Sequence, residues 1–157
     1  MHTDDHGSRI LQIMLLDEDL TYRVRGVFIE VSRQYGSGHK ERVYQEACCE
    51  TFTRSGIPFV AQPRVPVHSM DTGRTLATHI PDFVVGERIV VELKAMPWLH
   101  PAASAQLEQY LWVTEYEIGF LVNFGLPKVQ ITRRIFTNDR KPWMVALANG
   151  KSGQQHP

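Results

Sequence analysis

The chain has 157 residues, of which 43% are hydrophobic and 22% charged, a composition typical of a single globular domain. Seventeen basic residues balance seventeen acidic ones, so the formal net charge is zero, which argues against a protein that holds nucleic acid by a broad positive field. The only two cysteines are adjacent, which excludes a disulfide framework or zinc-ligand spacing, and the apolar stretch 10–16 is too short to span a membrane, so we expect a cytoplasmic protein.

The first part of the chain predicts two helices. Residues 1–18 lack strong periodicity and are expected to form an N-terminal arm, irregular or with a short extra element. From Asp19 onward, apolar residues recur at spacings of three and four, which predicts a helix that ends at Gly36 and Gly38. A second helix is expected over 39–54.

Three strands should follow. Segment 57–68 is rich in valine but contains three prolines, which predicts an edge strand or a bent strand. The turn residues 70–73 predict a hairpin that leads into a strand over 76–85. Gly86-Glu87 then joins this strand to another over 88–95.

The last third predicts a helix over 102–114, a strand over 118–124 that is buried on both faces, and a final strand over 129–136. One domain is therefore expected over 19–137, followed by a frayed tail over 138–157. The order ααβββαββ, with its three central strands in a meander, predicts an α/β fold with a mixed β-sheet flanked by helices.

The most informative stretch places Asp82 ten residues before Glu92, with Lys94 two residues further on. Because side chains alternate along a strand, Glu92 and Lys94 should share one face. A hairpin through Gly86-Glu87 would bring Asp82 close to the register of Glu92. Two carboxylates and one ammonium on a shared face suit phosphodiester hydrolysis, because carboxylates bind a hard divalent cation and the lysine can approach the attacking water or the scissile phosphate.

In this pattern the sequence resembles the PD-(D/E)XK nuclease superfamily. Asp82 with Glu92-Leu93-Lys94 is similar to its metal-binding motif, and Gln106 with Tyr110 resembles the QxxxY pattern of the RecB-type branch. Upstream, segment 38–44 fits GxxExxY, the signature of a small bacterial family within the superfamily. The resemblance extends from about residue 20 to residue 136 and implies a restriction-endonuclease-like core.

The resemblance also implies roles for individual residues. Asp82, Glu92 and the Leu93 carbonyl would bind Mg²⁺, with Mn²⁺ as a substitute, and Glu41 would add a carboxylate directly or through water. Lys94 would orient the nucleophilic water and stabilise charge on the phosphorane. Further substrate-binding or bracing residues would be Gln106, Tyr110 and Tyr44, with Asn123 and His79 as weaker candidates.

Several of these residues also have an ordinary structural interpretation. Glu41 could be a solvated helix residue paired with a neighbouring cation, and Gln106 with Tyr110 could belong to an amphipathic helix. Tyr44 is expected to pack in the core, and His79 to be structural or exposed. The loop Trp98-Leu99-His100-Pro101 should cap the helix after it, although its aromatic side chain could stack on a base.

Two functions therefore compete, ahead of a third and least favoured interpretation, a plain α/β interaction domain whose motifs are coincidental. The first is a divalent-metal-dependent nuclease, favoured to act on DNA, in which metal-activated water attacks the scissile phosphate. The second is a non-catalytic nucleic-acid-binding or regulatory subunit on a nuclease-like fold, which the zero net charge supports. The sequence leaves open the choice of DNA over RNA, endonuclease over exonuclease action, protein partners and a homodimer.

Overall fold

The computed structural model describes residues 5–152 of the chain. The elements follow one another as α1 (Asp5–Tyr35), α2 (Glu41–Arg54), β1 (Phe59–Ala61), β2 (Val65–His68), β3 (Thr75–His79), β4 (Phe83–Val85), β5 (Ile89–Lys94), α3 (Ala102–Val113), β6 (Ile118–Asn123), β7 (Gln130–Ile135), the 3₁₀ turn η1 (Asn138–Arg140) and α4 (Pro142–Ser152). Within the described part of the chain, no helix combines the length and apolarity needed to cross a membrane.

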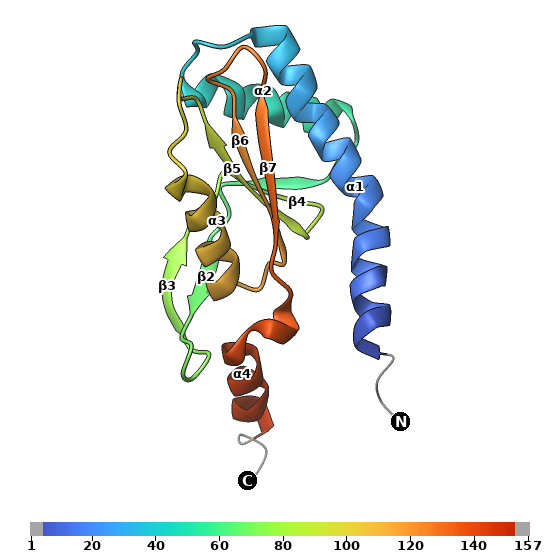
Figure 1. The fold of residues 1–157 in the computed structure, drawn as a ribbon, viewed down its shortest axis with the longest axis vertical. Coiled ribbons are helices and arrows are strands. Elements are labelled where there is room, and N and C mark those ends of the chain that lie inside the picture. The colour runs from blue at the N-terminus through green and yellow to red at the C-terminus, as the bar shows by residue number, and fades with distance from the viewer. Residues whose placement is uncertain (1–4, 153–157) are drawn as a thin grey trace.

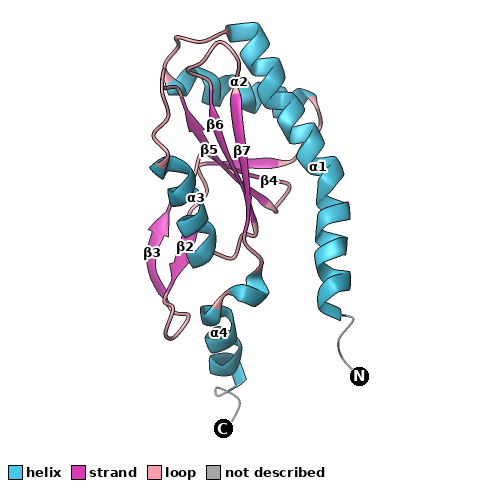
Figure 2. Cartoon of the chain, viewed as in Figure 1, coloured by secondary structure: helices cyan, strands magenta, loops and turns pink. Residues whose placement is uncertain are grey.

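A five-stranded sheet organises the molecule, with the strand order β1-β4-β5-β6-β7 (Figures 1 and 2). Strands β5 and β6 pair in parallel and are connected by α3, whereas the other neighbours pair antiparallel. Helices α1 and α2 pack on one face and α3 on the other. The predicted α/β fold with a mixed sheet flanked by helices is therefore confirmed.

The larger core lies between the sheet and helices α1 and α2. Phe28 of α1 is fully buried and makes edge-on contacts with Phe52 of α2 and Phe120 of β6. The smaller core lies under α3, where Leu107 packs over Gly119 so closely that a Cβ on Gly119 would lie 2.8 Å from Leu107 Cδ1. The absence of a side chain at this point allows α3 to pack closely against β6.

The expected irregular N-terminal arm is wrong for residues 5–18, because α1 begins at Asp5 and is continuous to Tyr35. The N-terminal half of α1 extends beyond the sheet (Figure 1). Apolar residues recur at helical spacing where one face of a helix packs on a core. A helical segment that extends beyond the core need not show this spacing. No proline interrupts 5–35, so helix propensity is sufficient to continue the helix. Residues 1–4 of the predicted arm lie outside the described part.

The expected meander of three strands is also wrong, because two predicted strands are each broken in two. Gln62, with a φ of 50°, and Pro63 separate β1 from β2, and Pro81 lies between β3 and β4. Strands β2 and β3 form a separate two-stranded sheet, joined by the hairpin predicted at 70–73. The edge position predicted for the proline-rich segment is confirmed for β1.

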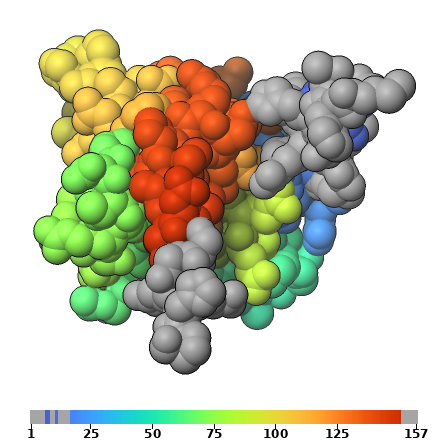
Figure 3. All heavy atoms as spheres, turned by 90° about the horizontal axis from the view of Figure 1, so that it is seen from below, coloured from blue at the N-terminus to red at the C-terminus, as the bar shows by residue number. Residues whose placement is uncertain are grey.

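The segment expected to be a frayed tail instead forms η1 and α4 up to Ser152, and residues 153–157 lie outside the described part. Trp143 is fully buried, and its ring stacks on the His68 ring of β2 with centroids 4.2 Å apart. Lys141 is also buried and donates to the carbonyls of Thr114 and Tyr116 after α3. Helix α4 thus lies beside the β2–β3 hairpin, as Figure 3 shows from below.

A contact between two loops gives the first prediction. The substitution Gly125→Ala would overlap its Cβ with the backbone of Met96, whereas Gly26→Ala on α1 would meet nothing within 4 Å. We expect Gly125→Ala to lower the free energy of unfolding by about 2–3 kcal/mol, a value typical of overpacked sites. Gly26→Ala should raise it by about 0.5–1 kcal/mol, because alanine favours the helix. Urea unfolding of both variants tests this, and equal changes would contradict it.

Candidate active site

Strand β5 presents two different faces. Val91 and Leu93 are buried in the core beneath α1 and α2. Glu92 and Lys94 point to the opposite face and line a pocket beside α3. This alternation is the one predicted from the sequence, and it places a carboxylate and an ammonium on the same side of a buried strand.

Asp82 lies immediately before β4 and meets β5 at the expected register. Phe83 pairs with Val91 in the antiparallel β4–β5 ladder. Continuing this register by one residue places Asp82 opposite Glu92. The backbone N–H of Leu93 donates a hydrogen bond of 2.7 Å to Asp82 Oδ2. Because the N–H and C=O of one strand residue point to the same edge, the Leu93 carbonyl is expected to face this side too.

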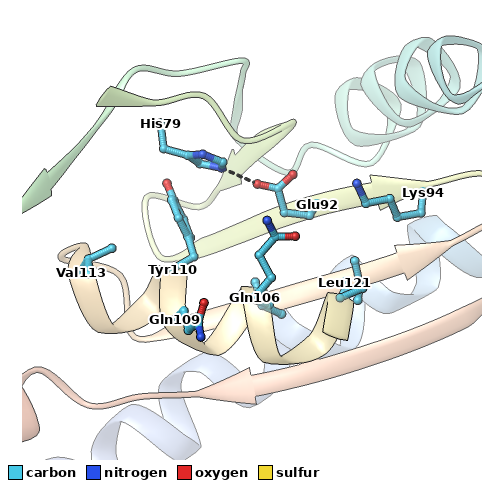
Figure 4. Close-up of a pocket in the computed structure, with 10 residues that line it drawn as sticks. His79, Glu92, Lys94, Gln106, Gln109, Tyr110, Val113 and Leu121 are labelled. Atoms are coloured by element: carbon cyan, nitrogen blue, oxygen red, sulfur yellow. Dashed lines mark hydrogen bonds and ion pairs between the residues drawn. The ribbon is translucent and has the colours of Figure 1, made fainter. Parts of the chain in front are cut away.

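The pocket has a volume of about 380 Å³ and is formed by β3, β5, β6 and α3. Gln106 and Tyr110, one helical turn apart on α3, reach up from its floor toward β5 (Figure 4). The structure thus brings both residues of the QxxxY pattern together with Glu92 and Lys94. The Tyr110 hydroxyl is buried and has no hydrogen-bond partner among residues 5–152.

Three carboxyl groups respond to the charge of Lys94. Burial raises the pKa of Asp82 above its ordinary value, against the hydrogen bond from Leu93 and the charge of Lys94, which lower it. Burial also raises the pKa of Glu92, against the hydrogen bond from His79, and the charge of Asp82 raises it further. Glu41 is exposed as a residue, yet partial burial of its carboxyl group and the charge of Asp82 raise its pKa, while Lys94 lowers it. Asp82 and Lys94 therefore act electrostatically on both Glu41 and Glu92.

His79 closes the pocket from β3, a position that sequence reasoning did not favour. Its Nε2–H donates to Glu92 Oε1 at 2.8 Å, and its ring lies against Tyr110 with centroids 4.2 Å apart. An uninterrupted strand over 76–85 would have placed His79 and Asp82 on opposite faces. The break at Pro81 removes that constraint. The sequence signal for the position of His79 is therefore the proline that lies between it and Asp82.

The structure does not place Tyr44 in the pocket. Its ring is fully buried and stacks on Phe124 with centroids 4.6 Å apart, as its core interpretation predicted. Its hydroxyl donates to the Gly36 carbonyl at 2.7 Å and accepts a 3.3 Å hydrogen bond from the His39 backbone. Tyr44 therefore holds the loop that leads to Glu41.

Asn123 also has a structural position. Its Oδ1 accepts from the backbone N–H groups of Met96 and Gly125, and its Nδ2 donates to the Met96 carbonyl, each at 3.0 Å. These hydrogen bonds connect the end of β6 to the loop that follows Lys94. The side chain thereby fixes the direction in which the chain leaves the site.

Within residues 5–152, the structure contains no group of three or more histidine, cysteine, aspartate or glutamate side chains that could hold a metal ion. The carboxylates that approach one another are the pair Asp82 and Glu92, with Glu41 close enough to affect Asp82 electrostatically. Two half-buried carboxylates beside a backbone carbonyl are the kind of oxygen ligands that hard divalent cations prefer.

Comparison with known proteins agrees with this geometry. The family model of the PD-(D/E)XK nuclease superfamily matches residues 18–135, which include every element from the middle of α1 to the end of β7. Neither the curated proteins nor the solved structures gave a significant match. The matched range holds Asp82, Glu92 and Lys94 on a mixed sheet flanked by helices, and the chain therefore belongs to the PD-(D/E)XK nuclease superfamily, with a restriction-endonuclease-like fold.

Proposed function

We propose that this protein is a divalent-metal-dependent nuclease that cleaves DNA, with Asp82, Glu92 and Lys94 at its centre. The observation that supports this most strongly is that two half-buried carboxyl groups, with pKa values raised by burial, lie within electrostatic range of Lys94, and that Glu92 and Lys94 line one pocket. Buried charges are costly unless they are paired or coordinate a cation, so their concentration at one place favours a functional explanation.

The side chains fit a divalent cation such as Mg²⁺, with Mn²⁺ as a substitute. Asp82, Glu92 and the Leu93 carbonyl would hold it, and Glu41 would contribute directly or through water. When bound, the cation supplies a lowered pKa for a coordinated water and positive charge opposite the phosphate oxygens. It would also offset the unfavourable burial that raises the pKa of both carboxyl groups.

The remaining residues act on the substrate or on the carboxylates. The Lys94 ammonium would donate to a phosphate oxygen and stabilise the charge that develops there. The Gln106 amide and the unpartnered Tyr110 hydroxyl face the same pocket and would bind the phosphate backbone. His79 donates to Glu92 and leaves the other carboxylate oxygen free of this bond, which orients the group.

A non-catalytic nucleic-acid-binding or regulatory subunit is the second candidate, favoured by the formal net charge of zero. A nuclease that binds nucleic acid alone is usually more basic. Calorimetric titration with Mn²⁺ separates the two. Binding that disappears in Asp82→Asn supports the nuclease, and absence of binding to the unchanged protein supports the subunit.

The first test of the nuclease is Lys94→Ala. We expect the rate of DNA cleavage in Mg²⁺ or Mn²⁺ to fall by about 100-fold or more, because the variant lacks the cation that stabilises the transition state. Lys128→Ala is the matched control, since Lys128 is exposed and borders a different pocket beside α1. Release of labelled fragments measures both rates. Cleavage by Lys94→Ala at the unchanged rate would refute the assignment.

The raised pKa of Glu92 predicts that its charged carboxylate lowers the stability of the fold when no metal is bound. A group that holds its proton more tightly when folded stabilises the fold at low pH, and this stabilisation is lost as the pH rises through the raised pKa. Without metal at neutral pH, Glu92→Gln should therefore raise the free energy of unfolding. The difference should shrink as the pH falls toward 4.5, the ordinary value for the carboxyl group.

Urea unfolding measures this difference, with and without Mg²⁺. Added Mg²⁺ should stabilise the unchanged protein more than the variant, because a ligand that binds the folded state stabilises it. An equal response of both proteins to Mg²⁺ would contradict a role for Glu92 in metal binding.

Tyr110→Phe distinguishes a functional tyrosine from an ordinary half-buried one. The hydroxyl is buried without a partner, so its removal should leave the free energy of unfolding unchanged or raise it slightly. Cleavage should fall by about 10-fold if the hydroxyl binds the phosphate backbone. Tyr116→Phe, outside this pocket, is the matched control. Full activity of Tyr110→Phe would favour the structural interpretation.

A further inference from the structure

The loop that follows Lys94 exposes two large apolar side chains next to the candidate active site. Trp98 is 65% exposed and Met96 is 47% exposed. Single exposed apolar residues are common on protein surfaces. Here both lie within four residues of Lys94, which would contact the scissile phosphate. Their position therefore favours a contact with the substrate.

The loop is anchored at both ends. The backbone of Met96 is held by Asn123 through two hydrogen bonds of 3.0 Å. At the other end, His100 Nδ1 accepts a 3.0 Å hydrogen bond from the Ala102 backbone at the start of α3. The Trp98 and His100 rings meet edge to face with centroids 5.5 Å apart. The loop backbone is therefore fixed at both ends, and the exposed indole rests against His100.

A second hollow, of about 520 Å³, adjoins the pocket on the side of this loop. Met96, Leu99 and His100 line it from the loop, and residues of α3 line its other side. Lys94 lies at the junction of the two pockets, which share Lys94, Ala103, Gln106 and Gln109. The hollow is thus continuous with the place where the scissile phosphate would sit.

The lining of this hollow combines apolar surface with a few polar groups. Met96, Leu99 and the alanines of α3 supply apolar surface, while Gln106 and Gln109 supply amides. An amide both donates and accepts, so it can pair with the edge of any base. Trp98 does not line the hollow but is exposed on the same loop, between the lining residues Met96 and Leu99. Its aromatic surface can stack on any base, because all bases have a π face. These features suit a nucleobase without selecting one.

We propose that the Met96–His100 loop, with the hollow beside it, binds an unpaired base of the nucleotide next to the scissile phosphate, and that the substrate is single-stranded DNA at the point of cleavage. Within a duplex both faces of each base are covered by its neighbours, so a base that stacks on Trp98 must be unstacked first. The inference rests on the proposed nuclease function, because that function places the phosphate at Lys94.

Binding without cleavage provides the test. The full chain in EDTA is titrated into a labelled oligothymidine strand and into a blunt hairpin duplex of equal charge, and fluorescence anisotropy gives each Kd. We expect tighter binding of the single strand, weakened about 10-fold by Trp98→Ala and far less by Trp98→Phe, because phenylalanine can still stack. Tyr22→Ala, which alters an aromatic residue 78% exposed on α1, is the matched control and should bind as the unchanged protein does.

A strand with one abasic site sharpens the result. If the missing base is the one that stacks on Trp98, the abasic site weakens binding to the unchanged protein but has no further effect on Trp98→Ala. Equal affinity for single strand and duplex, or unchanged affinity in Trp98→Ala, would overturn the proposed base-binding subsite at the Met96–His100 loop.

Failure of the subsite and failure of the nuclease can be told apart. If Trp98→Ala binds and cleaves the single strand like the unchanged protein while Lys94→Ala cleaves nothing, the subsite is wrong and the nuclease stands. If no metal supports cleavage but Trp98→Ala loses affinity for the single strand, the subsite stands and the catalytic assignment fails.

Discussion

The candidate site depends on the burial of strand β5 between β4 and β6. A strand in this position must direct alternate side chains into two different environments. One set, with Val91 and Leu93, completes the core under α1 and α2. The other set, with Glu92 and Lys94, faces α3 and gains a rigid base from that core. Functional groups on such an element are held more accurately than groups on a loop.

The walls of the pocket depend on a second feature, the division of the strands into two sheets. Because the chain breaks at Pro81, β3 leaves the main sheet and His79 can reach Glu92 across the pocket. The β2–β3 hairpin is supported from its other side, where Trp143 of α4 stacks on His68. The C-terminal helix therefore supports the wall that holds His79, although it lies outside the pocket.

How much of this could be predicted depends on the range of the interactions. The shared face of Glu92 and Lys94 follows from strand alternation, and the position of Asp82 follows from a short hairpin, so local rules were sufficient for both. The place of His79 depends on a contact between two sheets, which no local pattern specifies. Helix α4 is similar, since Trp143 is buried only because a distant hairpin covers it.

Charge balance within the site connects its geometry to the proposed chemistry. Three carboxyl groups, those of Asp82, Glu92 and Glu41, lie within electrostatic range of one lysine, and burial raises the pKa of each. One ammonium and one histidine hydrogen bond do not lower these pKa values to the ordinary range. A fold that needed only packing here would be more stable with apolar or amide side chains, because unpaired buried carboxylates are unfavourable. Residues kept at a cost to stability are concentrated where a ligand offsets that cost, and the ligand that offsets an excess of carboxylates is a cation.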